Sequence, residues 1–232
     1  FIDDVSISKT PENAISLSKE VIGGWWLDYM NYTGAGLNNI RGLDYTVTPL
    51  SQLANHPYVF ESYIKNVGIS QQAVVLNYNV TGSGTASGIS SMIVLNSQED
   101  SVFTTTPGFS PTALGNYTVD IWGEADSLGA GVTIVTSDTI RKNIEVTNYI
   151  YGKDLGVANS QSSYIIGGPN EQNHFTTRYE MYADEQLYGL RAYISDNSTV
   201  GAKVKAVIYE VDTTANNGVI FLASSADYYL TA

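Results

Sequence analysis

Apolar and polar side chains alternate along much of the first two thirds of the chain. Four segments follow this pattern, and each would present one apolar face: residues 58–65, 74–80, 117–122 and 138–146. Successive side chains of a strand point to opposite faces of a sheet, so a period of two predicts half-buried strands. Turn-forming residues lie between them, and strands separated by turns about every 8–12 residues are typical of an antiparallel sandwich. The sequence therefore predicts an all-β fold, with an immunoglobulin-like antiparallel sandwich over residues 11–148.

A second set of strand-like segments follows Tyr149. These segments cover residues 175–182, 186–195, 203–211 and 219–224, and Asn216-Asn217-Gly218 predicts a hairpin turn before the last of them. We interpret residues 149–232 as a second β-sandwich module. The final run, residues 226–232, is strand-like and has no closing element after it, so we expect this module to be truncated.

The first ten residues read as a strand followed by a linker. Phe1, Ile2, Val5 and Ile7 supply its apolar side chains, and Pro11 marks the start of the sandwich region. One interpretation makes this segment the terminal strand of an upstream domain. The other makes it an intersubunit strand that adds to the edge of a neighbouring sheet, in another subunit or in the second module. Head-to-tail contacts of that kind propagate into filaments unless the rotation closes a ring.

Composition narrows the functional classes. Only 15% of the 232 residues are charged, against about 25% in an ordinary soluble domain, and the net charge is -12. Such a charge repels phosphate backbones, so we expect no nucleic-acid partner. There is no cysteine for a disulfide, a thiolate metal site or a thiol nucleophile. No run of about 18 apolar residues predicts a membrane span. A polar, acidic, β-rich chain is typical of secreted bacterial proteins.

Several short motifs occur in an order that matches a known family. Residues 1–7 resemble the closing strand of an upstream jelly-roll domain, and residues 45–52 and 60–68 resemble the first two strands of a sandwich. Residues 115–119 and 137–139 resemble its last two strands, and residues 151–156 resemble an exit motif. In this order the chain resembles the multidomain surface and secreted proteins of Bacteroidota that leave the cell by type IX secretion. The part of those proteins that it resembles contains a CARDB-like immunoglobulin-like domain. The insert at residues 21–39 departs from that pattern.

The resemblance implies an extracellular, non-catalytic role, structural or adhesive, with neighbouring β-domains as partners. From the residues, Asn66 and Gly68 are expected to end a strand in left-handed backbone conformations. At the exit motif we expect a junction between the two modules, with Tyr149 and Tyr151 partly buried.

Candidate chemistry is sparse. His56 and His174 each lack a second histidine at metal-ligand spacing, and no Gly-x-Ser-x-Gly elbow occurs. Asp120 and Glu124 would share a strand face about 13 Å apart, at 3.3 Å per residue, which is too far for a paired acid and base. We therefore predict no catalytic residue, no cofactor and no enzyme activity. Calcium held by Glu124, Asp126 and a backbone carbonyl is the weaker alternative to solvated acidic loops.

The Gly- and Ser-rich run at residues 81–91 lacks the Gly-Lys-Ser/Thr ending of a phosphate-binding loop, and we interpret it as a flexible hairpin connection. The aromatic cluster in the insert is more informative, because aromatic rings can stack on sugars or fill a core. We favour the interpretation that these side chains pack in the core or at a domain interface. The alternatives are a carbohydrate-binding module for surface glycans and an accessory domain of a secreted hydrolase. The cluster comprises Trp25, Trp26, Tyr29 and Tyr32.

Overall fold

The computed structural model describes residues 9–22, 45–126, 128, 132–153, 176–177, 179–212, 214 and 218–231. The chain divides into two compact units, one of residues 1–156 together with Tyr179–Asp184 and the other of residues 157–178 together with 185–232. The predicted intersubunit strand lies outside the described residues, and the predicted domain boundaries stay predictions.

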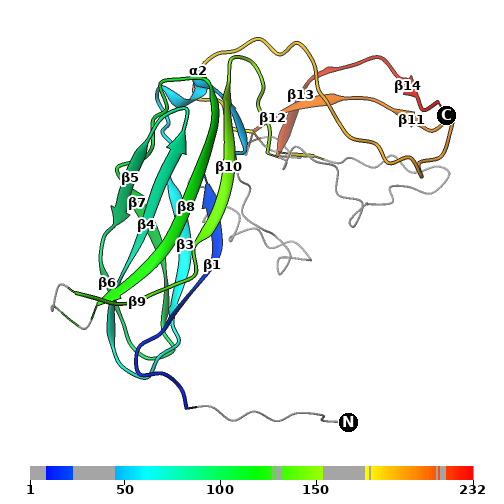
Figure 1. The fold of residues 1–232 in the computed structure, drawn as a ribbon. Coiled ribbons are helices and arrows are strands. Elements are labelled where there is room, and N and C mark those ends of the chain that lie inside the picture. Colours follow the sequence, from blue (N-terminus) through cyan, green and yellow to red (C-terminus); the bar gives the residue numbers. More distant parts are fainter. Residues whose placement is uncertain are drawn as a thin grey trace, which may run out of the picture. The chain divides into compact units, whose positions relative to one another are not determined.

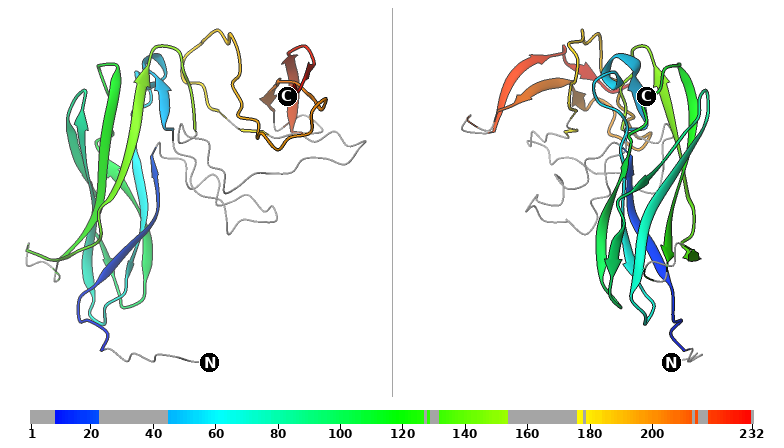
Figure 2. Two further views of the ribbon diagram at one scale, coloured as in Figure 1. Left: turned by 45° about the vertical axis from the view of Figure 1, so that its right-hand side comes forward. Right: turned by 90° about the vertical axis from the view of Figure 1, so that its left-hand side faces the viewer.

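The first unit is a sandwich of two β-layers in one curled sheet (Figures 1 and 2). The sheet order is β1-β3-β7-β5-β4-β8-β10-β2, with β6 paired to β4 and β9 to β8. All pairs are antiparallel except β10 with β2, which is parallel. The bounds are β1 Ile15–Ile22, β2 Val47–Pro49, β3 Phe60–Asn66, β4 Gln72–Gly82, β5 Ala86–Ser90, β6 Ile93–Leu95, β7 Asp100–Thr106, β8 Gly115–Asp126, β9 Thr133–Thr136 and β10 Ile140–Thr147.

The core of the sandwich is built from the apolar side of the predicted alternation. Along β8, Tyr117, Val119 and Ile121 are buried, while the residues between them are partly exposed. Gly123 continues this inward row, and a Cβ there would lie 3.0 Å from Ile64 Cδ1, so glycine lets a strand of the other layer approach. The predicted immunoglobulin-like sandwich is confirmed by this two-layer strand arrangement.

The first predicted strand of the sandwich is shorter than expected. Residues 45–52 were predicted to be one strand, but β2 covers only Val47–Pro49, and the helical turn α2 follows at Leu50–Leu53. The turn buries Gln52 and Leu53 together, which an extended strand with alternating faces would not do. Burial at the end of the sandwich therefore overrides the strand pattern here.

The Gly- and Ser-rich run forms a hairpin, as predicted, but most of it is strand and only residues 83–85 make the connection. β4 continues to Gly82, and β5 begins at Ala86. Gly88 lies opposite Tyr78, and a Cβ on it would overlap the Tyr78 ring. This glycine makes room for an aromatic ring on a paired strand, which is a use that composition alone does not distinguish from a loop.

The Asn66 turn is structural, as predicted, but its geometry differs from the prediction. Neither Asn66 nor Gly68 has a positive φ. Asn66 is fully buried, and its side chain accepts from the Gly68 N–H at 3.0 Å and donates to the Ser70 and Leu95 carbonyls at 2.8 and 3.0 Å. Gly68 is required for close approach, since a Cβ there would lie 2.7 Å from the Glu12 carbonyl oxygen.

The second unit consists, in its described part, of two antiparallel ribbons. β12 (Val207–Val211) pairs with β13 (Val219–Ser224), as the predicted hairpin requires, and β11 (Lys203–Val204) pairs with β14 (Tyr228–Tyr229). The predicted strands at 175–182 and 186–195 are wrong for the residues described there, which form no strand. Their alternating pattern is present, but no described strand pairs with it. A strand without a partner has no ladder to hold it.

Candidate functional site

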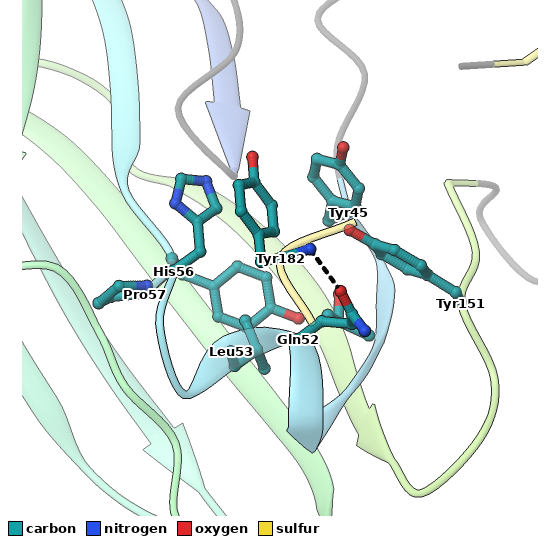
Figure 3. A pocket seen from close by; sticks show the side chains of 9 residues that line it. Tyr45, Gln52, Leu53, His56, Pro57, Tyr151 and Tyr182 are labelled. Carbon is teal, nitrogen blue, oxygen red and sulfur yellow. Dashed lines mark hydrogen bonds between the residues drawn. The ribbon is translucent and has the colours of Figure 1, made fainter. Parts of the chain in front are cut away.

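A short segment from far along the chain lies against one end of the sandwich. We call Tyr179–Asp184 the strap; it belongs to the first unit. Gln52, on α2, donates from Nε2 to the Ala183 carbonyl at 3.0 Å. Its Oε1 accepts from the Tyr182 N–H at 2.7 Å (Figure 3) and from the Ala183 N–H at 3.2 Å. With 1% of its surface exposed, Gln52 serves the strap as a paired strand would, through one amide donor and one acceptor.

Aromatic side chains hold the strap from both sides of Gln52. The Tyr182 ring stacks on the His56 imidazole, with centroids 3.8 Å apart (Figure 3). Tyr151 stacks on Tyr45 at 5.2 Å and packs against Tyr179 at the same distance. The two tyrosine–tyrosine distances lie within the separation at which aromatic pairs are favourable. The strap is therefore packed as well as hydrogen-bonded.

Polar groups at the rings hold the strap backbone. The Tyr151 hydroxyl donates to the Glu180 carbonyl at 3.0 Å, and the Tyr45 hydroxyl accepts from the Glu180 N–H at 3.4 Å. The Lys153 ammonium lies 4.0 Å from the Tyr45 ring centroid, which is a cation–π distance. Of the predicted junction aromatics, Tyr151 is half-buried as expected. Tyr149 is 87% exposed, so the expectation for it is wrong.

The strap leaves almost no free space beneath it. A pocket of about 10 Å³ is lined by His56, Tyr58, Tyr182 and their neighbours (Figure 3). A single water molecule needs about 10–15 Å³. This end of the sandwich is thus filled by the chain itself and has no room for a substrate in the structure described.

Burial shifts the titration of the side chains around the strap. Burial lowers the pKa of His56, and the nearby Glu180 carboxylate opposes this shift. Burial raises the pKa of the Tyr58 and Tyr151 hydroxyls, so both stay protonated near neutral pH. A neutral imidazole stacked on a tyrosine ring is a packing arrangement, and nothing in this geometry presents His56 as a general base.

The predicted acidic groups are engaged by neighbouring side chains. Arg141 donates two bonds to the Asp120 carboxylate, at 2.7 and 2.8 Å, and these bonds lower the pKa of Asp120. Glu124 accepts from Trp122 Nε1 at 2.8 Å and from the Thr133 hydroxyl at 3.1 Å. Within the described part of the chain, no three His, Asp or Glu side chains gather as metal ligands would. The calcium alternative at Glu124 and Asp126 stays a prediction.

Several predicted site residues lie outside the described residues. They are His174 and the insert aromatics Trp25, Trp26, Tyr29 and Tyr32. Gln52 could not be identified from the sequence, because a glutamine among mixed polar and apolar residues carries no signal of its own. Alternation placed Tyr182 and Trp122 only on strand faces and gave neither a role. No helix in the described part is long and apolar enough to span a membrane.

Comparisons with known proteins give distant similarities of fold. No protein-family model matches the chain, and no curated protein matches it. Among solved structures, a CARDB domain of a Pyrococcus furiosus protein, in complex with di-metal ions, is 14% identical, with a TM-score of 0.33 over 60% of this chain and 97% of that chain. PapD-like domain 7 of human CEP192 is 11% identical, with a TM-score of 0.32 over 64% and 96%.

A third solved structure is the C-terminal domain of Wzt. It is 16% identical, with a TM-score of 0.34 over 52% of this chain and 72% of that chain. Likenesses with identities and TM-scores this low carry no argument about ligand, activity or fold. The assignment as an immunoglobulin-like sandwich rests on the strand order and the shared core described above.

Proposed function

We propose that the chain is a non-catalytic structural or adhesive segment of an extracellular bacterial protein, of the surface or filament type exported by type IX secretion in Bacteroidota. The observation that carries the proposal is the strap. The chain is held at the end of the sandwich twice, once at residues 151–153 and again at 179–184. A connector held at two points resists being pulled away from its domain, which suits a segment that transmits load.

The first attachment uses backbone pairing. Gly152 exchanges two hydrogen bonds with Val47, the first residue of β2, at 3.1 and 2.7 Å, in an isolated antiparallel bridge. The second attachment uses the buried side chain of Gln52 and the rings of Tyr151 and Tyr182. Each net hydrogen bond is worth about 0.5–1.5 kcal/mol, and both sets must be broken before the whole connector can extend.

A non-catalytic role is supported by the occupation of the polar side chains. Asp120 is paired with Arg141, Glu124 holds an indole and a hydroxyl, and His56 is stacked and neutral. A general acid–base pair needs one group of each kind within reach of a substrate. The described residues supply no such pair around an open cleft.

Two measurements test the proposal. Antibody against the chain should label intact cells of the source organism, with a cytoplasmic protein as the negative control, and labelling only after lysis would contradict the extracellular location. The purified chain should not hydrolyse glycans, esters or peptides. Turnover that disappears in His56→Ala or His174→Ala would refute the non-catalytic role.

The filament part of the proposal has its own test, which concerns residues 1–7. Sedimentation of the full chain is compared with that of a variant lacking those residues. Assembly that disappears on deletion supports strand addition between subunits. An unchanged sedimentation coefficient would contradict filament assembly through residues 1–7, and the proposal would then be limited to a single structural segment.

A further inference from the structure

An irregularity in the β8 pairing opens a hollow on the outer face of the sandwich. Glu124 pairs with Thr136 on β9, and Ile121 pairs with Ile140 on β10. Between these pairs, three residues on one side (137–139) oppose two on β8 (122 and 123), so one residue is extra. This is the arrangement of a β-bulge, and bulges occur next to binding sites because they re-aim side chains and interrupt pairing.

The bulge is held in place by Ser137. Its backbone N–H donates to the Gly123 carbonyl at 2.9 Å, and its hydroxyl accepts from the Gly123 N–H at 2.8 Å. The same hydroxyl donates to the Asp138 carbonyl at 2.8 Å. The serine side chain thus replaces the missing backbone acceptor of the ladder. A bulge fixed by these bonds is a built feature of the fold and not a frayed strand end.

The hollow beside the bulge is shallow and open to solvent, with about 400 Å³ of space over its lining. One aromatic side chain, Trp122, and five polar ones line it among the described residues. Three of the polar side chains have no hydrogen-bond partner among the described residues, so their groups are available to a ligand: Asn79, Thr136 and Thr139.

The orientation of Trp122 is fixed before any ligand arrives. Its Nε1 donates to Glu124 Oε1 at 2.8 Å, and the other oxygen of that carboxylate accepts from the Thr133 hydroxyl at 3.1 Å. Two residues before Trp122 on the same face of β8, the Asp120 carboxylate is held by two bonds from Arg141. A ring and a carboxylate that are already immobilised lose little conformational entropy on binding.

We propose that this hollow, centred on Trp122, binds a neutral, hydroxyl-rich sugar of a polysaccharide. A pyranose ring presents an apolar face for the indole and hydroxyl groups for amide, hydroxyl and carboxylate partners. Of the described lining, only Trp122 is apolar, which disfavours a mainly hydrophobic ligand. The net charge of -12 disfavours an acidic one. The proposal goes beyond the proposed function, since a purely structural segment needs no ligand site.

The test uses the full purified chain and a panel of cellohexaose, xylohexaose, mannohexaose and maltoheptaose, with affinity measured by calorimetry. At least one of these probes should bind. In Trp122→Ala the dissociation constant should rise at least about tenfold, as the loss of an aromatic anchor does at other interfaces. Asn79→Ala should also weaken binding without removing any hydrogen bond within the described chain. Asn116→Ala, on the same face of β8 but outside the hollow, is the matched control and should leave affinity unchanged.

The chain contains three tryptophans, so the same panel locates the site. Binding that survives Trp122→Ala and Asn79→Ala but disappears in a Trp25→Ala/Trp26→Ala variant would overturn this proposal and place the sugar at the insert. No binding by the parent chain to any probe would also overturn it. Because folding of each variant is checked by its cooperative thermal unfolding, an unfolded Trp122→Ala leaves Asn79→Ala to decide. The binding test is independent of cell location, so its failure leaves the proposed function standing.

Discussion

Replacing Gln52 by alanine should release the strap while leaving the sandwich folded. The substitution removes three hydrogen bonds to Tyr182 and Ala183. At about 0.5–1.5 kcal/mol each, their loss weakens strap docking by about 1.5–4.5 kcal/mol. The β-layers have their own core of buried side chains, which does not include Gln52, so their pairing should persist.

Hydrogen exchange of the Tyr182 and Ala183 amides measures this change directly. Both amides donate to Gln52 Oε1, and exchange requires the strap to open. Since about 1.4 kcal/mol corresponds to a factor of ten, their exchange should accelerate about 10- to 1,000-fold. Amides in β8 should be unaffected.

Two further variants sharpen the result. Gln52→Met keeps most of the side-chain volume but removes the same three hydrogen bonds, so it should release the strap as Gln52→Ala does. Gln71→Ala removes an exposed glutamine whose Nε2 donates to Asn96 Oδ1 at 2.8 Å, and it should leave strap exchange unchanged. If exchange at 182 and 183 in Gln52→Ala stays within about twofold of the parent chain, Gln52 does not hold the strap and the reasoning fails.

Three other outcomes follow from the structure. Because the folded-state pKa of His56 is below 6.5, the stability that its neutral form contributes is full above that pH and is lost as the pH falls through the folded pKa. Hydrogen exchange of the strap amides, corrected for the intrinsic rate, should therefore be faster at pH 5 than at pH 7. His56→Phe should abolish this difference. Asn66→Ala should lower the free energy of unfolding, measured in urea, by at least about 3 kcal/mol, because several buried partners lose their hydrogen bonds. Asn143→Ala, on an exposed strand face, is the control and should lower it by less than about 0.5 kcal/mol. Millimolar calcium should not change the melting temperature, since Glu124 already accepts two hydrogen bonds, and a clear rise would instead support the calcium site at Glu124 and Asp126.

The sandwich could be predicted from the sequence because its information is local. Alternation along β4 and β8 states which side chains face inward, and the structure buries those same side chains, such as Leu76 and Val119. This alternation of apolar and polar residues can be recognised in a single sequence, even when the partner strand is not known. The failures occur where a residue's role depends on a distant partner.

Gly88 and Gln52 show why the remainder could not be predicted. Glycine in a Ser-rich run indicates a loop, unless an aromatic ring on the paired strand needs its space, as Tyr78 does. The role of Gln52 depends on its hydrogen-bond partners in the strap, which lie 130 and 131 positions further along the chain. The predicted strand at 186–195 fails for the converse reason, since its pattern is present but no described strand pairs with it.

The separation between Gln52 and the strap also sets an order of events in folding. The last strand of the sandwich ends at Thr147, and Ala183 follows 36 residues later (183 − 147). At a synthesis rate of about 5–20 residues per second, the sandwich is available for roughly 2–7 s before its own strap exists. During that interval the Gln52 amide and the surrounding rings form an open acceptor for an extended peptide. A strap from a neighbouring copy would satisfy the same bonds, so crowded nascent chains are at risk of exchanging straps and forming domain-swapped dimers.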